Sequence, residues 1–585
     1  MQYKWTVLTN TTLGGLMASI NMTIVMISLP TIFRGLNIDP TAPGQFTLLL
    51  WMLMGYSIVM ATMLVTFGRL SDVFGRTKLY TIGFLIFTVG SILLSVIPGG
   101  SGINGAYMLI GLRMVQAIGG GLLMVNSTAL ITDAFSSKER GKALGINQIS
   151  FIAGSLIGLI LGGILAAYDW HMVFLVNVPF AVAGSLWSIF RLHEITKGQK
   201  VPIDLVGNVL LGGGLIFVSL GFTYSLVPFG SSSMGWGDPW VLSSFVIGIA
   251  MVVFFVFYER KAPYPLFNMK LFKIRPFAFG NFAGFLSSLG RGAVMFLTII
   301  WLQGIYLPLN GYQYSQTPFW AGVYTLPMMA GFIILGPVSG MLTDRYGARL
   351  FATTGMVVAA VSLYLMTLLP ANFSGSLWEF EGILLLNGVA MGLFASPNTT
   401  SIMNSLPPED RGVGSGMRAT LQNIGQTISM AVFFSITITI FSSNLPGSME
   451  SLGASLNLPA KLISMLVSIP PSGALFAAFL GINPISSLPA SVLSQLPPST
   501  VKLITSPTFF PNAIASSFMI GLREALYIAV IISLIAAFFS AMRGKRYVHG
   551  ESEAMEGGIA IPGAAETDKE TLPHAVAEPG SGGSK

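Results

Sequence analysis

The amino-acid sequence predicts an all-α polytopic membrane protein in which two homologous six-helix bundles flank two further helices. Composition is the first reason, because 53% of the residues are hydrophobic and 9% are charged, whereas soluble proteins carry about 25% charged residues. Hydropathy is the second reason. Fourteen apolar runs each approach the roughly 20 residues that a membrane-spanning helix needs. The third reason is an internal repeat of a short charged loop.

The apolar runs set the predicted organisation of the chain. The first six form a bundle over 1–192, and runs seven and eight form a two-helix insertion over 193–274. Runs nine to thirteen (275–443) and the last run (515–543) form the second bundle. The runs lie near 6–33, 46–67, 79–97, 105–132, 143–167, 172–190, 205–226, 240–258, 278–305, 319–342, 350–369, 381–404, 419–443 and 515–541.

The charged loop Gly68–Lys78 separates the second run from the third and recurs downstream in the same setting. Asp72 and Asp344 are 272 residues apart, and the same offset relates Gly75 to Gly347 and Asn126 to Asn398. Charges, glycines and hydropathy therefore repeat in parallel. This pattern predicts two halves related by an axis along the membrane normal, an arrangement typical of transporters.

The distribution of cations predicts the orientation. If the 68–78 loop is cytoplasmic, 24 of the 30 Lys and Arg residues lie on that side, four lie on the other side and two lie within spans. Such asymmetry predicts a multi-pass plasma-membrane protein with both termini in the cytoplasm. The excess of basic residues therefore reflects the orientation of the chain in the membrane, and no nucleic-acid partner is expected.

Several function classes are excluded by what the sequence lacks. There is no cysteine, which excludes disulfides, thiolate metal sites and a cysteine nucleophile. The four histidines show no metal-ligand spacing, and Gly119–Gly121 lies inside a span with no lysine after it, unlike an ATP-binding loop. No nucleophile–base pair stands out. We expect neither an enzyme nor a cofactor or metal site.

The segment 444–514 on the outer side is too long for an ordinary connection. It is apolar, carries only three charged residues and is interrupted by several prolines. Its most helix-like pieces, 461–469 and 472–482, are too short to span a bilayer. We expect an apolar extracellular subdomain or interfacial hairpin that packs on the bundle rim or the lipid interface. A re-entrant pair is the alternative. The tail 544–585 has a composition typical of disorder.

The repeated loop predicts a cytoplasmic latch. Arg69, Asp72 and Arg76 can form a charge-paired clasp, in which Asp72 accepts hydrogen bonds from a neighbouring helix N-terminus. Gly68 and Gly75 allow the close backbone approach that this needs. The alternative is a loop whose charges only set topology. The full predicted latch consists of Gly68, Arg69, Asp72, Gly75, Arg76, Asp133, Asp344 and Arg345.

These residues resemble the major facilitator superfamily, and more narrowly its fourteen-span drug:proton antiporters. The loop Gly68-x-Leu70-x-Asp72-x-x-Gly75-Arg76-x-Lys78 is similar to the family's signature between spans two and three. Leu109-x-x-x-Arg113-x-x-Gln116 is similar to its buried-arginine motif in span four. In span five, glycines at the positions of the antiporter motif are Gly154, Gly158, Gly162 and Gly163. The resemblance covers about residues 10–443 and 515–541.

Two departures from the family pattern alter what the resemblance implies. Asn21 stands in the first-span motif where aspartate is usual, and asparagine cannot titrate. Leu159 replaces a proline beside Gly158 and so removes an expected bend. A proton role at position 21 therefore does not carry over. We expect Asn21 to hydrogen-bond a substrate or another helix.

Charges inside spans are candidate functional groups, because a charge at bilayer depth is costly unless it faces a cavity or a partner. Arg113 in span four and Arg291 in span nine are the two cations. Glu381, at the start of span twelve, and Glu524, in span fourteen, are the acidic candidates. We expect these four to act in transport or coupling. A purely structural pairing of the arginines with backbone carbonyls is the alternative.

The central cavity is predicted from in-span polar and aromatic residues. Flexible methionines and flat rings suit an adaptable apolar cavity, although most of them must face lipid. The expected cavity residues are Asn21, Trp51, Tyr56, Gln116, Asn126, Tyr324 and Asn398.

The resemblance implies a major-facilitator fold that works by alternating access. It implies proton-driven export of hydrophobic or cationic drug-like compounds, with a small-molecule substrate, protons and the lipid bilayer as partners, by a monomer. Two in-span arginines and the missing first-span aspartate favour a different solute, one that is anionic or neutral. A non-transporting membrane sensor is the other alternative.

Overall fold

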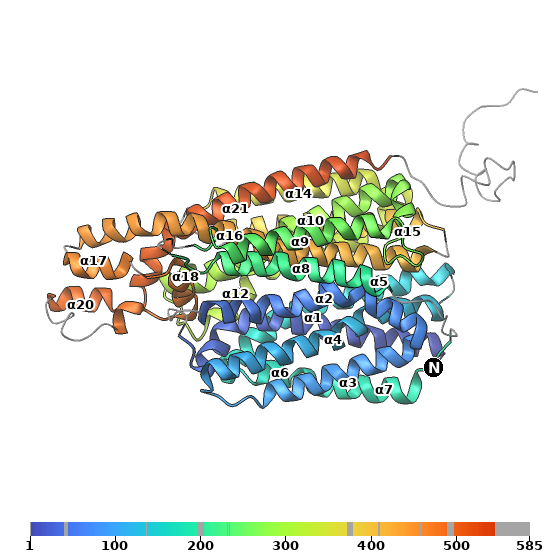
Figure 1. Cartoon of the computed structure of the whole chain (residues 1–585), viewed down its shortest axis with the longest axis horizontal. Helices are drawn as coiled ribbons and strands as arrows, with labels where there is room; N and C mark the ends of the chain where they lie inside the picture. Colours follow the sequence, from blue (N-terminus) through green and yellow to red (C-terminus); the bar gives the residue numbers. More distant parts are fainter. Residues whose placement is uncertain are drawn as a thin grey trace, which may run out of the picture.

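The computed structural model describes residues 2–39, 45–135, 137–195, 204–230, 232, 234–370, 378–407, 410–456, 458–467, 469–487 and 496–544. Within these ranges the protein is almost entirely helical and forms one elongated bundle (Figure 1). The predicted tail lies outside the described residues apart from Gly544. Thirteen helices there are long and apolar enough to span a membrane. The prediction of an all-helical multi-pass membrane protein is confirmed.

The first half consists of α1 to α7. Their bounds are α1 (Tyr3–Leu36), α2 (Gln45–Phe74), α3 (Arg76–Ser95), α4 (Gly102–Ala134), α5 (Ser137–Tyr168), α6 (Met172–Leu175) and α7 (Asn177–Arg191). Helix α5 corresponds to the remaining predicted span, although only 153–168 is strongly apolar.

Helix α5 packs along α1, and the two helices approach each other closely. A Cβ added to Gly154 would lie 2.5 Å from the Leu16 carbonyl oxygen, and one at Gly158 would lie 2.7 Å from that of Ile20. Small residues permit such helix contacts in membranes.

The second half repeats this order. Its elements are α10 (Arg275–Trp301), the π-helical turn η2 (Leu302–Tyr306), α11 (Leu307–Leu309), α12 (Thr317–Tyr324), α13 (Leu326–Tyr346), α14 (Ala348–Thr367), α15 (Trp378–Asn404), α16 (Arg411–Ser455) and α21 (Phe509–Met542). A short 3₁₀ turn, η1 (Met269–Lys273), precedes it. The repeat is visible in the backbone. Gly75 and Gly347 separate consecutive helices with φ angles of 102° and 80°, which side chains other than glycine rarely adopt.

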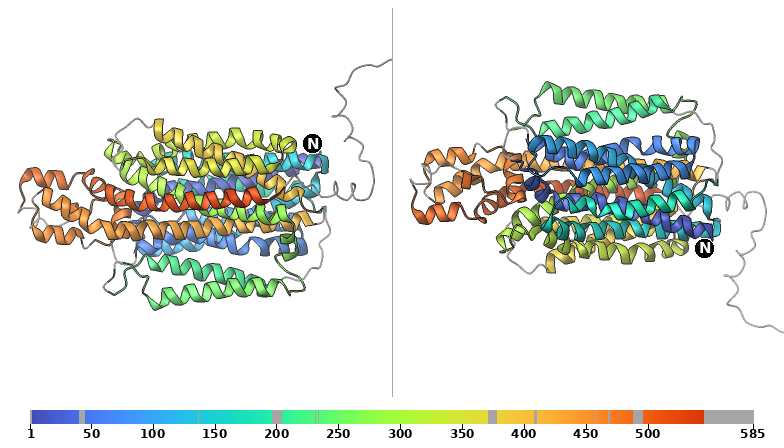
Figure 2. Two further views of the ribbon diagram at one scale, coloured as in Figure 1. Left: turned by 90° about the horizontal axis from the view of Figure 1, so that it is seen from above. Right: turned by 90° about the horizontal axis from the view of Figure 1, so that it is seen from below.

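The insertion consists of α8 (Leu205–Ser225) and α9 (Pro239–Glu259), which lie side by side at one edge of the bundle (Figure 2). Each begins at an aspartate that caps it, because Asp204 accepts a bond from the Gly207 N–H and Asp238 from that of Trp240. Helix α8 packs on α2 of the first half and on α16 of the second. The insertion therefore bridges the two halves.

The segment 444–514 forms a lobe that projects from one end of the bundle (Figure 1). Helix α16 continues as a helix to Ser455, twelve residues past the predicted end of its span at 443. The lobe then contains α17 (Ala460–Val467), α18 (Pro471–Leu480), the 3₁₀ turn η4 (Pro484–Ser487) and α20 (Pro498–Ile504). We call this end the lobe end, and the end with Gly75 and Gly347 the latch end.

Candidate functional site

The first half places a buried arginine at the centre of a hydrogen-bonded network. One terminal nitrogen of Arg113 on α4, Nη1, donates to Asn21 Oδ1 (3.4 Å), to the Asn21 carbonyl oxygen (3.5 Å) and to Gln116 Oε1 (3.4 Å). Asn21 Nδ2 donates to Gln116 Oε1 at 3.0 Å, and Gln116 Nε2 donates to Ser91 Oγ at 2.8 Å. Helices α1, α3 and α4 therefore meet at one polar cluster.

The network is closed off from solvent and contains no carboxylate. Arg113 is 3% exposed, and Asn21 and Gln116 are fully buried. The guanidinium carbon lies 4.6 Å from the centre of the Tyr56 ring on α2, a distance typical of a cation–π contact. The Arg113 Nε and the Tyr56 hydroxyl are buried without a hydrogen-bond partner. Within the described residues this cation is compensated only by neutral groups.

The local sequence explains why these helices come so close. A Cβ added to Gly90 of α3 would lie 3.2 Å from Gln116 Cβ, and one at Gly120 of α4 would lie 2.5 Å from the Tyr56 hydroxyl oxygen. Glycine at both places lets α3 and α2 approach α4 at the depth of Arg113. The predicted residues Asn21, Tyr56 and Gln116 thus converge on the predicted arginine.

Arg291 occupies a different environment in the second half. It is exposed, and its Nη1 lies 3.8 Å from the Met391 sulfur on α15. It follows Gly284 by seven residues and therefore shares its helix face. An added Cβ at Gly284 would lie 3.3 Å from Asn398 and 3.4 Å from Gln422. That face points toward α15 and α16, so the exposed guanidinium faces the interior of the second half.

Two further arginines enter the second half, and sequence reasoning assigned both to the cytoplasmic surface. Arg418, two turns into α16, donates to Thr399 Oγ1 and Gln422 Oε1, each at 3.2 Å. Arg543, just beyond α21, is 2% exposed and donates to Asn398 Oδ1 at 2.7 Å. Burial lowers the pKa of Arg543 to about 10. The available signal for Arg418 was its place directly before the predicted apolar run 419–443.

The remaining predicted cavity and coupling residues do not join the Arg113 network. The Asn126 amide donates to Leu122 of its own helix, and Tyr324 shares a 2.8 Å hydroxyl–hydroxyl bond with Tyr312 near the lobe end. Trp51 packs against an apolar cluster of α2, α8 and α16. Glu524 is exposed and Glu381 is half-buried at the start of α15.

The latch end contains part of the predicted clasp. Arg76 Nη1 lies 2.7 Å from Asp133 Oδ1, and Arg69 Nη2 donates to the Pro265 carbonyl oxygen at 2.8 Å. The carboxylate at the N-terminus of α3 belongs to Glu194, which accepts the N–H groups of Arg76 (2.9 Å) and Thr77 (3.0 Å). Glu194 was not among the predicted latch residues.

Arg345, the predicted latch cation of the second half, forms no comparable ion pair with the described residues. Arg345 is exposed, and its guanidinium lies 5.4 Å from the centre of the Tyr346 ring. The side chains of Asp72 and Asp344 lie outside the described part of the chain.

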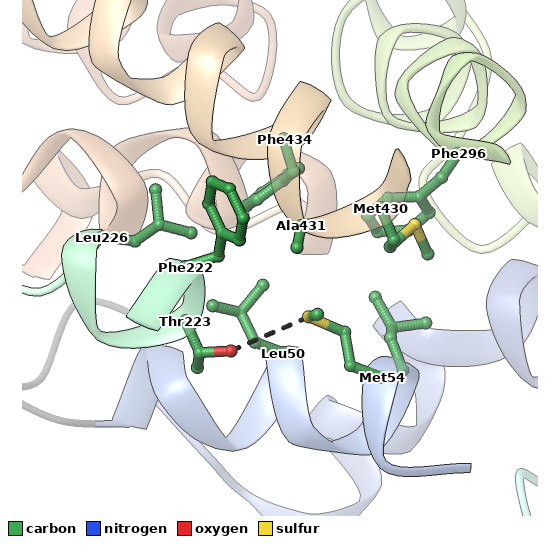
Figure 3. Close-up of a pocket in the computed structure, with 10 residues that line it drawn as sticks. Leu50, Met54, Phe222, Thr223, Leu226, Phe296, Met430, Ala431 and Phe434 are labelled. Carbon is green, nitrogen blue, oxygen red and sulfur yellow. Dashed lines mark hydrogen bonds between the residues drawn. The ribbon is translucent and has the colours of Figure 1, made fainter. Parts of the chain in front are cut away.

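A small apolar cavity of about 10 Å³ lies where α2, α8, α10 and α16 meet (Figure 3). Thr223 of α8 donates across it to the Met54 sulfur at 3.8 Å. Such a volume holds about one water molecule, so helix contact rather than a wide channel joins the halves here. Its lining residues are Leu50, Leu53, Met54, Phe222, Thr223, Leu226, Phe296, Met430, Ala431 and Phe434.

Comparison with known proteins gives concordant results. The family model described as Major Facilitator Superfamily matches residues 11–289 and 258–430. A riboflavin transporter, RibZ, of Clostridioides difficile is 28% identical over 437 residues, covering 74% of this chain and 88% of that protein. Multidrug resistance protein 3 of Bacillus subtilis is 26% identical, covering 76% of this chain and 81% of that protein.

Solved structures with a similar fold include an inward-facing bacterial homologue of the human lysosomal transporter Spinster. It has a TM-score of 0.52 and 15% identity, and the match covers 92% of this chain and 97% of that one. A D-xylose–proton symporter has a TM-score of 0.51 and 14% identity, with 74% and 90% covered. At these identities the likeness concerns the fold alone.

Proposed function

The chain belongs to the major facilitator superfamily, and we propose that it is a secondary active transporter whose substrate carries an anionic or hydrogen-bond-accepting group. The observation that carries this proposal is the Arg113 site, in which a buried guanidinium contacts only neutral groups among the described residues. Multi-pass membrane transport, without enzyme activity, is common to the family and its named relatives.

The geometry of the Arg113 site favours an acceptor on the substrate. A guanidinium offers five N–H donors in a planar fork. Here the bonds to Asn21 and Gln116 are long, at 3.4 to 3.5 Å, and Nε has no partner. A carboxylate or a ring carbonyl of a bound molecule can take up these donors at shorter distance, which strengthens each bond.

A cationic substrate is disfavoured by the same groups. Arg113, Arg291 and Arg418 all lie within spans. Two unit charges roughly 6 Å apart repel by about 3 kcal/mol at an effective dielectric constant of about 20, which corresponds to about a 100-fold loss of affinity. We therefore favour an anionic or neutral solute over the cationic drugs that the antiporter resemblance implies.

Export of neutral apolar compounds is the second candidate function. The close α1–α5 glycine contacts, at Gly154 and Gly158, match the positions of the antiporter motif. Relatives named as multidrug resistance proteins also favour export. Proton coupling is part of this proposal. Its titrating groups would be Glu381 or Glu524, because Asn21 cannot titrate.

The orientation and state of the protein are further parts of the proposal. We place the latch end in the cytoplasm of a plasma-membrane protein, because the sequence predicts 24 of the 30 cations on that side, and only Arg418 and Arg543 of the described ones among them turn into the second half. The 68–78 loop and its second copy then act as the cytoplasmic latch, with Arg76 and Asp133 as a paired element. The protein acts as a monomer, since each half already supplies the other's contact surface through α2 and α16.

Counterflow in proteoliposomes tests the substrate class. Three matched aromatic solutes, a carboxylate, its amide and the corresponding amine, are compared with and without an imposed pH gradient. We expect the carboxylate to be exchanged fastest and the amine slowest, and expect Arg113→Ala to abolish the preference. Arg260→Gln, which changes an exposed cation outside the spans, serves as the control. Faster exchange of the amine than of the carboxylate would contradict the proposal.

A further inference from the structure

Helix α18 (Pro471–Leu480) is buried on all sides although it belongs to the lobe beyond the predicted spans. All ten of its residues are buried, and the eight that follow Pro471 and Ser472 include Leu475, Phe476 and Phe479 at no more than 1% exposure. The helix carries no charge. At ten residues it is about 15 Å long, too short to cross a bilayer. Its burial therefore comes from the protein around it.

Both halves of the protein surround α18. It packs against α1 and α2 of the first half and against η2, α16 and α21 of the second. The Phe476 ring lies 5.7 Å, centre to centre, from that of Phe434 on α16. A Cβ added to Gly304 in η2 would lie 3.1 Å from the Phe479 Cα. The helix is thus seated between the halves at the lobe end (Figure 1).

The same π-helical turn that receives α18 also crosses to the first half. Gln303 is fully buried, and its Nε2 donates to the Ile27 carbonyl oxygen on α1 at 3.3 Å. Gly304, the next residue, meets α18. The turn η2 therefore contacts α1 through Gln303 and α18 through Gly304.

The lobe is joined to the second half through the chain at both ends, because it connects α16 to α21. Within the lobe, Asn483 Nδ2 donates to the Ile504 and Ser506 carbonyl oxygens at 2.8 and 3.1 Å, which ties the turn after α18 to α20. Tyr314, from the loop before α12, packs on Gly481 and donates to the Pro507 carbonyl oxygen at 3.3 Å. When the halves rock, α18 is therefore carried by the second half and slides or parts from α1 and α2.

We propose that α18 is a gate helix that closes the lobe-end opening of the transport pathway and parts from α1 and α2 when that end opens. This inference rests on the proposed transport function and on the alternating access that the family resemblance implies. It assigns the lobe a role in transport. A lobe that stayed fixed would only fill space between the halves. The occluding contacts are apolar, which lets them break and re-form without leaving a buried charge unpaired.

The absence of cysteine from the chain makes an accessibility test direct. Ile27→Cys places a reporter at the seam between the halves, because the Ile27 side chain lies against Gly162 of α5 and Gly322 of α12. Ala529→Cys, on the fully buried face of α21, is the matched control within one half. Both are exposed to a membrane-impermeant maleimide added from the lobe side.

Loosening α18 should raise labelling at the seam alone. In the Phe476→Ala/Phe479→Ala variant we expect cysteine 27 to react at least about tenfold faster, with cysteine 529 unchanged. Gly304→Ala, which adds a methyl group against the α18 backbone without removing apolar surface, should give a smaller rise of about twofold to fivefold. This second variant keeps the test valid if the double variant does not fold.

Two other outcomes would contradict the proposal that α18 is a gate helix. If neither reporter changes in the Gly304→Ala and double variants, α18 does not seal the seam. If both reporters rise together, the lobe only supports the fold. The labelling needs no substrate, so a failed counterflow assay with a positive labelling result refutes the proposed substrate class and leaves the gate standing.

Discussion

The two halves repeat the same loop and the same order of helices, yet they surround their central arginines differently. In the first half Arg113 is 3% exposed and is contacted by Asn21, Gln116 and Tyr56. In the second half Arg291 is exposed, and its Nη1 contacts the Met391 sulfur. The two arginines are not equivalent in the repeat, because the 272-residue offset relates Arg113 to Leu385 and Arg291 to Ser19. The scaffold is duplicated, but each half carries its in-span arginine on a different helix.

This difference should set how much each arginine contributes to substrate binding. The surroundings of Arg113 are dry and hold the guanidinium in place, so its interactions are strong and its orientation requires little reorganisation on binding. Arg291 is exposed and its Nη1 contacts the uncharged Met391 sulfur, which leaves its long side chain more freedom. We therefore expect the first half to dominate recognition of an anionic group.

The largest expected effect is a loss of transport rate, and it is measured by replacing each of the two arginines in turn. Arg113→Ala should lower the initial rate of carboxylate counterflow by about 100-fold, since removing a buried charge partner costs about 2–5 kcal/mol. Arg291→Ala should lower it by about fivefold, as for an exposed ion pair of up to about 1 kcal/mol. Rates are normalised to folded protein in the vesicles. Equal losses of counterflow rate in the two variants would show that the first half does not dominate recognition of the anionic group.

A substitution that places a carboxylate beside Arg113 tests whether this arginine is the one that binds the anionic group. Asn21→Asp is nearly isosteric and puts an anion where Oδ1 now lies 3.4 Å from Arg113 Nη1. The internal ion pair should compete with an anionic substrate and lower its transport by at least about tenfold, since the pair is buried. Transport of the matched amine should rise and become dependent on pH. Asn423→Asp, which adds the same charge on α16, controls for charge alone, and an unaltered carboxylate preference in Asn21→Asp would count against Arg113 as the anchor.

Asn126 and Asn398 occupy equivalent positions in the repeat. They provide a third test, which measures the free energy of unfolding. Asn398→Ala removes a partner of the buried Arg543 guanidinium and should destabilise the protein by about 3 kcal/mol. Asn126→Ala, whose amide bonds only within α4 among the described residues, should cost about 1 kcal/mol. Thermal unfolding in detergent reports both. A larger drop in Tm for Asn126→Ala would reverse our ranking of the two positions.

The smallest effect is expected at the latch end. Arg76 forms a 2.7 Å ion pair with Asp133, and the two side chains keep 25% and 13% of their surface exposed, so Arg76→Gln should cost about 1 kcal/mol. Arg345→Gln in the repeated loop changes an exposed residue stacked near Tyr346 and should stay within about 0.5 kcal/mol. The same unfolding measurement distinguishes them, and identical losses would show that the latch is symmetric.

The sequence by itself determined the membrane class, the order of the spans and the duplication. Lipid cannot satisfy backbone hydrogen bonds, so a long apolar run has to be helical, and this holds without knowledge of its neighbours. The repeat also located the two glycines with positive φ, Gly75 and Gly347. Asn21, Tyr56 and Gln116 were picked out as polar or aromatic groups within spans, and those are the groups that converge on Arg113.

Only the tertiary structure decided which faces meet. In a membrane both lipid and protein core accept apolar side chains, so hydropathy cannot tell the two faces of a span apart. Trp51, Asn126 and Tyr324 therefore looked equivalent to Asn21 in the sequence, although they lie outside its network. The position of Glu194 at the start of α3 depends on a contact between residues 117 to 118 positions apart. Helix α18 is the clearest case. Its ten uncharged residues suit an interfacial helix equally well, and its complete burial follows from the two halves that close around it.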